Sequence, residues 1–259
     1  MIGGIIGDIV GSIYEDGNMK SKDFPLWGEG CHFTDDTVLT VATADCILKG
    51  GRFEDYYYSY TSQFPSCGYG TNFMKWYFTR KFRNQFVPYQ SFGNGSAMRV
   101  GPVGWGYERM TDVLDKSRDS AICTHNHEEG VRGAQAIATC VFLARKNESK
   151  GHIKRFVEEK FSYNLDCSLE DGQKNHKWNA TSMQTVPQAI TAFLESDNYE
   201  DCVRNAIAIG GDSDTLACMA GSIAEAYYGV PSELREKAYT YLPEKIIEVI
   251  EKFEFRFGK

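Results

Sequence analysis

The sequence predicts an all-α domain, and three segments carry that prediction. Residues 2–14, 35–48 and 214–228 each place apolar or small side chains at helical spacing. Strand signals are few along the whole chain. With 259 residues, 42% of them hydrophobic, the chain can bury one large core. No internal repeat, low-complexity segment or linker divides it, so we expect a single domain over residues 1–259.

Charge and cysteine content narrow the class of protein. A net charge of -7 argues against a broad cationic surface for nucleic acid, although a bound metal can still attract an anionic small ligand. The eight cysteines form no CxxC pair, which is typical of buried thiols in a reducing compartment. Residues 1–14 lack a basic leader and are too short to span a bilayer. We therefore expect a cytoplasmic protein without a membrane partner.

The first expected helix, over residues 2–14, places Gly3, Gly7 and Gly11 four residues apart. Glycine weakens a helix, so this spacing indicates that another backbone approaches that face closely. Asp8 lies among isoleucines and Glu15 follows the apolar run. A carboxylate in such surroundings needs a partner.

The second expected helix, over residues 35–48, ends at Gly50-Gly51 and begins with Asp35-Asp36. Thr34 or Asp35 stands where an N-cap belongs. Two carboxylates at a helix start either cap the helix and compensate its dipole, or ligate a cation. The sequence leaves both readings open.

The middle of the chain is harder to interpret. Residues 53–92 are rich in aromatic residues interleaved with Lys and Arg, an arrangement that can stack nucleobases but is more typical of an amphipathic helix, which we expect over 76–82. The glycine-rich turn at 93–99 either presents N–H groups to phosphate or joins two helices. His125 and His127 precede an expected helix over 128–145 and favour a substrate contact or a structural hydrogen bond over a metal site.

The hydrophobic pattern is weak over residues 147–180 and strong in the segments that follow. Residues 147–180 predict loops and short helices, and 186–194 a short amphipathic helix with Pro187 near its start. Residues 214–228 are apolar or small almost all round, which predicts a helix at the centre of a bundle, ended by Gly229.

The start of that central helix carries a second carboxylate pair, Asp212 and Asp214. Buried carboxylates are unfavourable there unless a cation meets them. If this cluster faces Asp35 and Asp36, the oxygens suffice for two hard divalent ions.

Five segments in this order resemble the ADP-ribosylglycohydrolase family, of the dinitrogenase-reductase-activating and ADP-ribosyl-acceptor hydrolase type, and its compact bacterial branch in particular. The resemblance runs from residue 2 to about 231. The segments are Gly7–Glu15, Phe33–Thr37, Gly93–Arg99, Thr124–His127 and Gly210–Thr215.

The resemblance implies an orthogonal helix bundle that holds two Mg²⁺ or Mn²⁺ ions in a cleft. It assigns catalytic roles to Asp35 and Glu15, the latter on a loop that can cover the site in relatives. The metal ligands that it implies are Thr34, Asp35, Asp36, Asp212, Asp214 and Thr215. The substrate-binding residues that it implies are Gly93, Asn94, Gly95 and Ser96 at the diphosphate, and His125 near the distal ribose.

The expected activity is hydrolysis of an ADP-ribosyl link through an oxocarbenium-like transition state, with the ions polarising the ribose hydroxyls. We predict an arginine N-glycosidic link, because Asp16, Asp23, Glu29, Glu128 and Glu129 lie near the motifs and a guanidinium is cationic. Serine, a small molecule or a modified nucleic acid stays open as the acceptor. The alternatives are a dinuclear-metal phosphohydrolase and a non-catalytic ADP-ribose-binding module; the latter should have lost a metal-ligating Asp, and all four are present.

Overall fold

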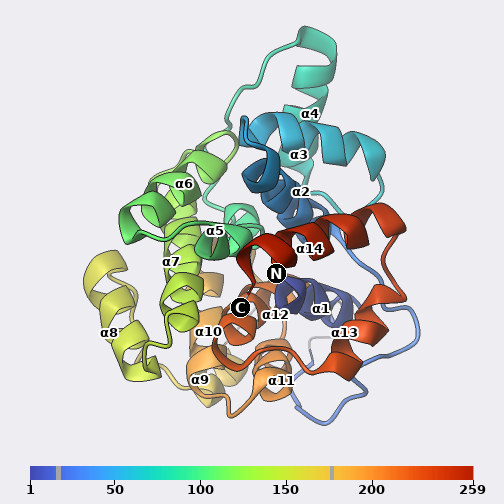
Figure 1. Ribbon diagram of the computed structural model, residues 1–259. Helices are drawn as coiled ribbons and strands as arrows, with labels where there is room; N and C mark the ends of the chain where they lie inside the picture. Colours follow the sequence, from blue (N-terminus) through green and yellow to red (C-terminus); the bar gives the residue numbers. More distant parts are fainter. Residues whose placement is uncertain (16–18, 176–177, 259) are drawn as a thin grey trace.

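Helices account for nearly all regular structure in the computed structural model, which describes residues 1–15, 19–175 and 178–258 (Figure 1). Within these ranges there is no strand, only an isolated bridge between Gly93 and Thr181. The all-α prediction is confirmed. The helices are α1 (Ile2–Gly11), α2 (Asp35–Lys49), α3 (Phe53–Gln63), α4 (Thr71–Arg83), η1 (Asn94–Ser96), α5 (Gly101–Gly106), α6 (Met110–Ile122), α7 (Glu128–Arg145), α8 (Lys150–Phe161), α9 (Leu169–Asn175), α10 (Ser182–Leu194), α11 (Tyr199–Ile209), α12 (Ser213–Tyr228), α13 (Ser232–Tyr239) and α14 (Glu244–Phe257).

Helix α12 lies at the centre of the bundle, as its all-round apolar surface predicts. It packs against α1, α7, α10 and α11, and every residue from Ser213 to Ala226 is buried (Figure 1). Helix α2 packs against α3, α5 and α14 and also contacts α1 and α12. The two carboxylate-bearing helix starts, of α2 and α12, therefore both point into the interior.

Helices α1 and α12 approach each other closely, and the glycines of α1 make this possible. A Cβ atom at Gly7 would lie 2.1 Å from the Ala217 carbonyl oxygen, and one at Gly11 would lie 2.5 Å from the Asp214 Cα. Since real Cβ contacts are never this short, only glycine lets the two backbones meet. The predicted close approach is confirmed, and it brings Asp8 of α1 next to Asp214 of α12.

Several element boundaries differ from the sequence prediction. The first helix ends at Gly11, not at residue 14, and the aromatic segment 53–92 contains two helices, α3 and α4, where we expected one. Helix α7 has the expected bounds. Helix α10 begins at Ser182, so Pro187 lies inside it. Burial of the apolar face of α10, which includes Ile190 and Phe193, outweighs the hydrogen bond that proline removes.

The cysteines are free thiols, as predicted, and six of the eight are buried. Cys67 is half-buried, and Cys167 is exposed, contrary to the expectation of burial. Among the described residues no helix has both the length and the apolar character needed to cross a membrane.

Candidate metal centre

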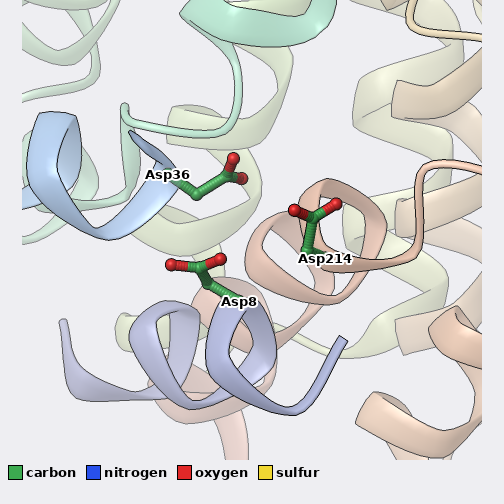
Figure 2. A group of neighbouring side chains, drawn as sticks. All are labelled: Asp8, Asp36 and Asp214. Atoms are coloured by element: carbon green, nitrogen blue, oxygen red, sulfur yellow. The ribbon is translucent and has the colours of Figure 1, made fainter. Parts of the chain in front are cut away.

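Carboxylates from three helices meet at one point in the interior. Asp8 comes from α1, Asp36 from the first turn of α2 and Asp214 from the first turn of α12, and their side chains point toward one another (Figure 2). One oxygen from each lies within 4.8 Å of the others. A second group, Glu15, Asp212 and Asp214, meets the same distance criterion and shares Asp214 with the first. The structure thus brings the two sequence clusters together, as predicted.

Asp8 holds the start of α2 in place. Its carboxylate accepts hydrogen bonds from the backbone N–H groups of Thr34, at 2.9 Å, and Thr37, at 3.1 Å, and from both hydroxyls. Asp8 is absent from the set of site residues that the sequence predicts. A carboxylate within an apolar, glycine-spaced helix was the signal that could have placed it there.

The capping alternative for the first cluster is resolved in favour of Thr34. Its hydroxyl oxygen accepts from the Asp36 N–H at 3.3 Å while its proton goes to Asp8 at 2.7 Å. Asp35 and Asp36 are therefore not needed as caps. Asp36 Oδ1 is buried and has no hydrogen-bond partner among the described residues.

The second cluster is tied to the glycine-rich turn and to the first cluster. Asp212 occupies the N-cap position of α12, but its side chain caps no N–H. Instead its Oδ2 accepts a hydrogen bond from Asn94 Nδ2 at 2.7 Å. The Thr215 hydroxyl donates to Asp36 Oδ2 at 3.3 Å, which connects the two clusters directly.

Burial and mutual repulsion raise the pKa values of the carboxyl groups in this cluster. Burial, followed by repulsion from Asp214 and Asp8, raises the pKa of Asp36 well above its usual range. Burial, Asp8 and Asp212 raise the pKa of Asp35 to about 8. None of the ion pairs within the described residues involves these carboxylates.

The donor set fits a hard divalent ion. It consists only of carboxylate and hydroxyl oxygens, which are the ligands that Mg²⁺ and Mn²⁺ prefer. The unpartnered Asp36 Oδ1 and the raised pKa values of the acids both show that positive charge would be stabilising here.

Asp36, Asp212 and Asp214 line a cleft of about 480 Å³, whereas Asp8 lies behind its lining. Asp35 and Glu15, the predicted catalytic residues, both line this cleft, as do Thr34 and Thr215. The Glu15 carboxylate accepts a hydrogen bond from Trp178 Nε1 at 3.3 Å. The indole of Trp178 is 61% exposed, so Glu15 lies where the cleft meets solvent.

Most of the predicted substrate-binding residues line the same cleft. Gly93, Asn94, Gly95 and His125 do so. A Cβ at Gly95 would lie 3.1 Å from His125 Nε2, so glycine keeps this passage open. Ser96 is not among the lining residues, because it is buried and its hydroxyl donates to the Gly130 carbonyl.

The two histidines have separate roles. Burial, and then the nearby Arg99 guanidinium, lower the pKa of His125 well below its usual range, so its ring is neutral in the cleft wall. Its Nδ1 lies 2.8 Å from the Thr124 hydroxyl. His127 caps α7, since its Nδ1 accepts from the Glu129 N–H at 3.1 Å. Of the two readings of the HxH motif, the structural hydrogen bond therefore applies to His127.

The model of the ADP-ribosylglycohydrolase family matches residues 1–256. The chain belongs to the ADP-ribosylglycohydrolase family. It is accordingly a glycohydrolase, and the family acts on ADP-ribosylated substrates.

Known proteins resemble the chain over most of its length. It is 26% identical to ADP-ribosylhydrolase ARH3 of Xenopus tropicalis, covering 88% of this chain and 86% of the relative, and 27% identical to ARH3 of Homo sapiens, covering 89% and 84%. ADP-ribosylarginine hydrolase Tri1 of Pseudomonas putida is 23% identical over 79% of this chain and 62% of the relative. A solved structure described as an ADP-ribosylglycohydrolase-related protein complex superposes over 100% of this chain and 96% of its own, with a TM-score of 0.77 at 21% identity. That likeness supports the fold.

Proposed function

We propose that this protein is a divalent-metal-dependent hydrolase that releases ADP-ribose from an ADP-ribosylated acceptor. The observation that carries the proposal is the convergence of two carboxylate groups that share Asp214, one of them Asp8, Asp36 and Asp214 and the other Glu15, Asp212 and Asp214, at the cleft. Such an arrangement is unfavourable in an empty site and becomes favourable when cations bind.

Two Mg²⁺ ions, or Mn²⁺ in their place, would be held by Thr34, Asp35, Asp36, Asp212, Asp214 and Thr215. When bound, they would supply Lewis-acid charge that polarises the ribose hydroxyls and a water. The buried carboxylate of Asp8 is better suited to orienting Thr34, because its oxygens already accept hydrogen bonds from the start of α2.

The chain's own residues then account for the proton transfers. Hydrolysis adds the water oxygen to C1″, the carbon of the distal ribose that carries the acceptor. The bond between C1″ and the acceptor breaks, and the acceptor leaves with the bonding electrons and a proton. Asp35 and Glu15 both line the cleft and are the carboxylates proposed to move that proton. The surrounding carboxylates also favour the positive charge that develops on the ribose in an oxocarbenium-like state.

An arginine-linked acceptor stays a prediction, but the structure does not support its basis, which was a set of acidic residues near the motifs. Asp23, Glu29, Glu128 and Glu129 do not appear among the residues that line the cleft. Asp16, the fifth acid of that argument, lies outside the described residues. The Pseudomonas putida relative is named an ADP-ribosylarginine hydrolase, which supports testing an arginine link in this protein.

The decisive experiment is a product assay on defined arginine-, serine- and nucleic-acid-linked ADP-ribose, with Mg²⁺, with Mn²⁺ and after chelation. Release of free ADP-ribose that depends on the metal supports the proposal. Release of inorganic phosphate would instead favour the phosphohydrolase alternative. Binding of ADP-ribose without turnover of any substrate would favour the non-catalytic module.

A further inference from the structure

An arm of the molecule borders the cleft and has no role in the metal centre. It consists of residues 71–91, which are α4 and the segment that follows it. Figure 1 shows α4 and this segment projecting at the top of the view, away from the central helices. Both ends of the arm line the cleft, through Thr71, Asn72 and Phe73 at one end and Tyr89 and Ser91 at the other. Anything bound along the arm would therefore lead directly into the site.

The outer face of the arm exposes aromatic rings and cations together. Lys75, Phe78 and Phe82 follow one another at spacings of three and four residues, so they share one face of α4. Phe78 is 42% exposed and Phe82 is 76% exposed. Their rings are nearly parallel, with an interplanar angle of 12° and centroids 5.9 Å apart. Lys81 and Arg83 are exposed beside them.

The charge of this region is opposite to that of the whole protein. Between Asp55 and Glu108 the sequence has no acidic residue, although the net charge of the chain is -7. The cations of the arm are Lys75, Arg80, Lys81 and Arg83. Within the described residues none of them takes part in an ion pair. The positive charge of the arm is thus available to an anionic partner.

Aromatic packing fixes the arm in this position before any partner binds. The rings of Trp76 and Phe86 stack with centroids 5.1 Å apart, and those of Tyr58 and Tyr77 stack at 5.2 Å. The Arg80 guanidinium lies 4.8 Å from the Phe86 ring centroid, which ties the returning segment to α4. A preformed surface loses little conformational entropy on binding.

We propose that the outer face of the arm binds single-stranded nucleic acid and that the acceptor is such a strand carrying ADP-ribose, in place of the arginine that the sequence predicted. Unstacked bases would lie on Phe78 and Phe82, and the backbone phosphates would meet Lys75, Lys81 and Arg83. The patch is too small to serve a duplex, which needs the broad cationic surface that this acidic protein lacks. An acidic peptide would use the cations but leave both exposed rings without a stacking partner. The acceptor assignment rests on the proposed function, whereas strand binding does not.

The test is fluorescence anisotropy of an unmodified, labelled oligo-dT strand with the full chain, over a range of salt concentrations and without divalent metal. The double variant Phe78→Ala/Phe82→Ala should weaken binding about tenfold or more. The variant Lys81→Gln/Arg83→Gln should reduce the slope of log K against log salt by about 1.4, which is ~0.7 for each lost phosphate contact. The matched control is Lys252→Gln/Phe255→Ala on α14, which removes one cation and a phenylalanine that is 96% exposed on a helix that also carries Glu248, Glu251 and Glu254. It should bind like the wild type.

Turnover separates this inference from the proposed function. The Phe78→Ala/Phe82→Ala variant should raise KM for an ADP-ribosylated oligonucleotide about tenfold while leaving kcat/KM for a small ADP-ribosylated molecule unchanged. The inference is overturned if the wild type does not bind the strand, if the variants bind it as tightly, or if a duplex or poly-glutamate competes equally well. Hydrolysis of the small molecule is scored independently, so its absence would count against the proposed function alone.

Discussion

The candidate metal centre and the arm border the same cleft but differ in almost every physical respect. The candidate metal centre is acidic and mostly buried, and it is built from three helices, of which α1 and α12 meet backbone to backbone. The arm is exposed, free of acidic residues and held by aromatic stacking. One region confines negative charge where water is scarce, and the other presents positive charge where water is plentiful.

This difference indicates which region recognises the ADP-ribosyl group and which recognises the acceptor. The buried region can determine only which group enters the cleft, because its geometry is fixed by packing. The exposed region can determine what carries that group. Changes in the metal centre should therefore affect the reaction with every substrate, and changes in the arm should affect only substrates long enough to reach it.

The largest effect is expected from the metal ligands. Asp35→Asn, Asp36→Asn and Asp214→Asn should each lower kcat/KM by about 10³-fold or more, about 4 kcal/mol, on every ADP-ribosylated substrate. The control is Asp45→Asn. Asp45 is also a buried carboxylate of α2, but it accepts a hydrogen bond from Tyr60 and forms an ion pair with Lys49. Near-normal rates in the ligand variants would show that the carboxylates serve only the helix starts.

The next effect concerns the contact that brings Asp8 to Asp214. Gly7→Ala should lower the free energy of unfolding by about 3 kcal/mol, because its methyl group would overlap the Ala217 carbonyl. Gly151→Ala on α8 has open space around it and should instead raise stability by about 0.5–1 kcal/mol. Urea unfolding of the two variants measures the difference, and equal stabilities would contradict the packing argument.

Glu15→Gln should reduce kcat about 10²-fold while changing the affinity for Mg²⁺ much less. The reason is that a carboxylate at the edge of the cleft, bonded to Trp178, is better placed for proton transfer than for holding an ion. Isothermal titration with Mg²⁺, together with steady-state kinetics, separates the two roles. A parallel loss of metal affinity and turnover would make Glu15 a ligand.

Stability should depend on pH and metal together. A carboxyl whose pKa is higher in the folded protein favours folding while it is protonated, and this contribution is lost as pH rises through the folded value, about 8 for Asp35. In chelator, the melting temperature should therefore fall by about 4 °C or more between pH 6 and 8.5. Mg²⁺ at 100 times its Kd should restore about 2.7 kcal/mol at pH 8.5. A metal-free melting temperature that rises over this interval would contradict the geometry of the cluster.

The smallest expected effect is on the stability of variants in the arm. Phe78→Ala/Phe82→Ala should change the free energy of unfolding by less than about 1 kcal/mol, because both rings are already exposed to water. Trp76→Ala on the same helix should cost about 3–5 kcal/mol, since that indole is buried. Comparable losses in the two variants would mean that the outer rings support the fold rather than a ligand.

The sequence was sufficient for elements whose signal is local. The bounds of α2 and α7 and the central position of α12 follow from helical periodicity, flanking glycines and an all-round apolar surface. The same signals failed for α3, whose tyrosines do not separate an inner from an outer face in the sequence. They also failed at Pro187, where burial of the rest of α10 decides that the helix continues.

For the site, the sequence determined which residue types could hold cations, because paired carboxylates before an apolar helix are conspicuous in any chain. The folded chain was needed to show that Asp8 orients Thr34 beside them and that the Ser96 hydroxyl bonds to Gly130. It alone decided, too, that Thr34 rather than an aspartate caps α2. The physical reason is that hydrophobic periodicity indicates only which face of a helix is apolar. The residues that a side chain contacts are determined by packing between segments far apart in the chain, such as Gly7 against Ala217.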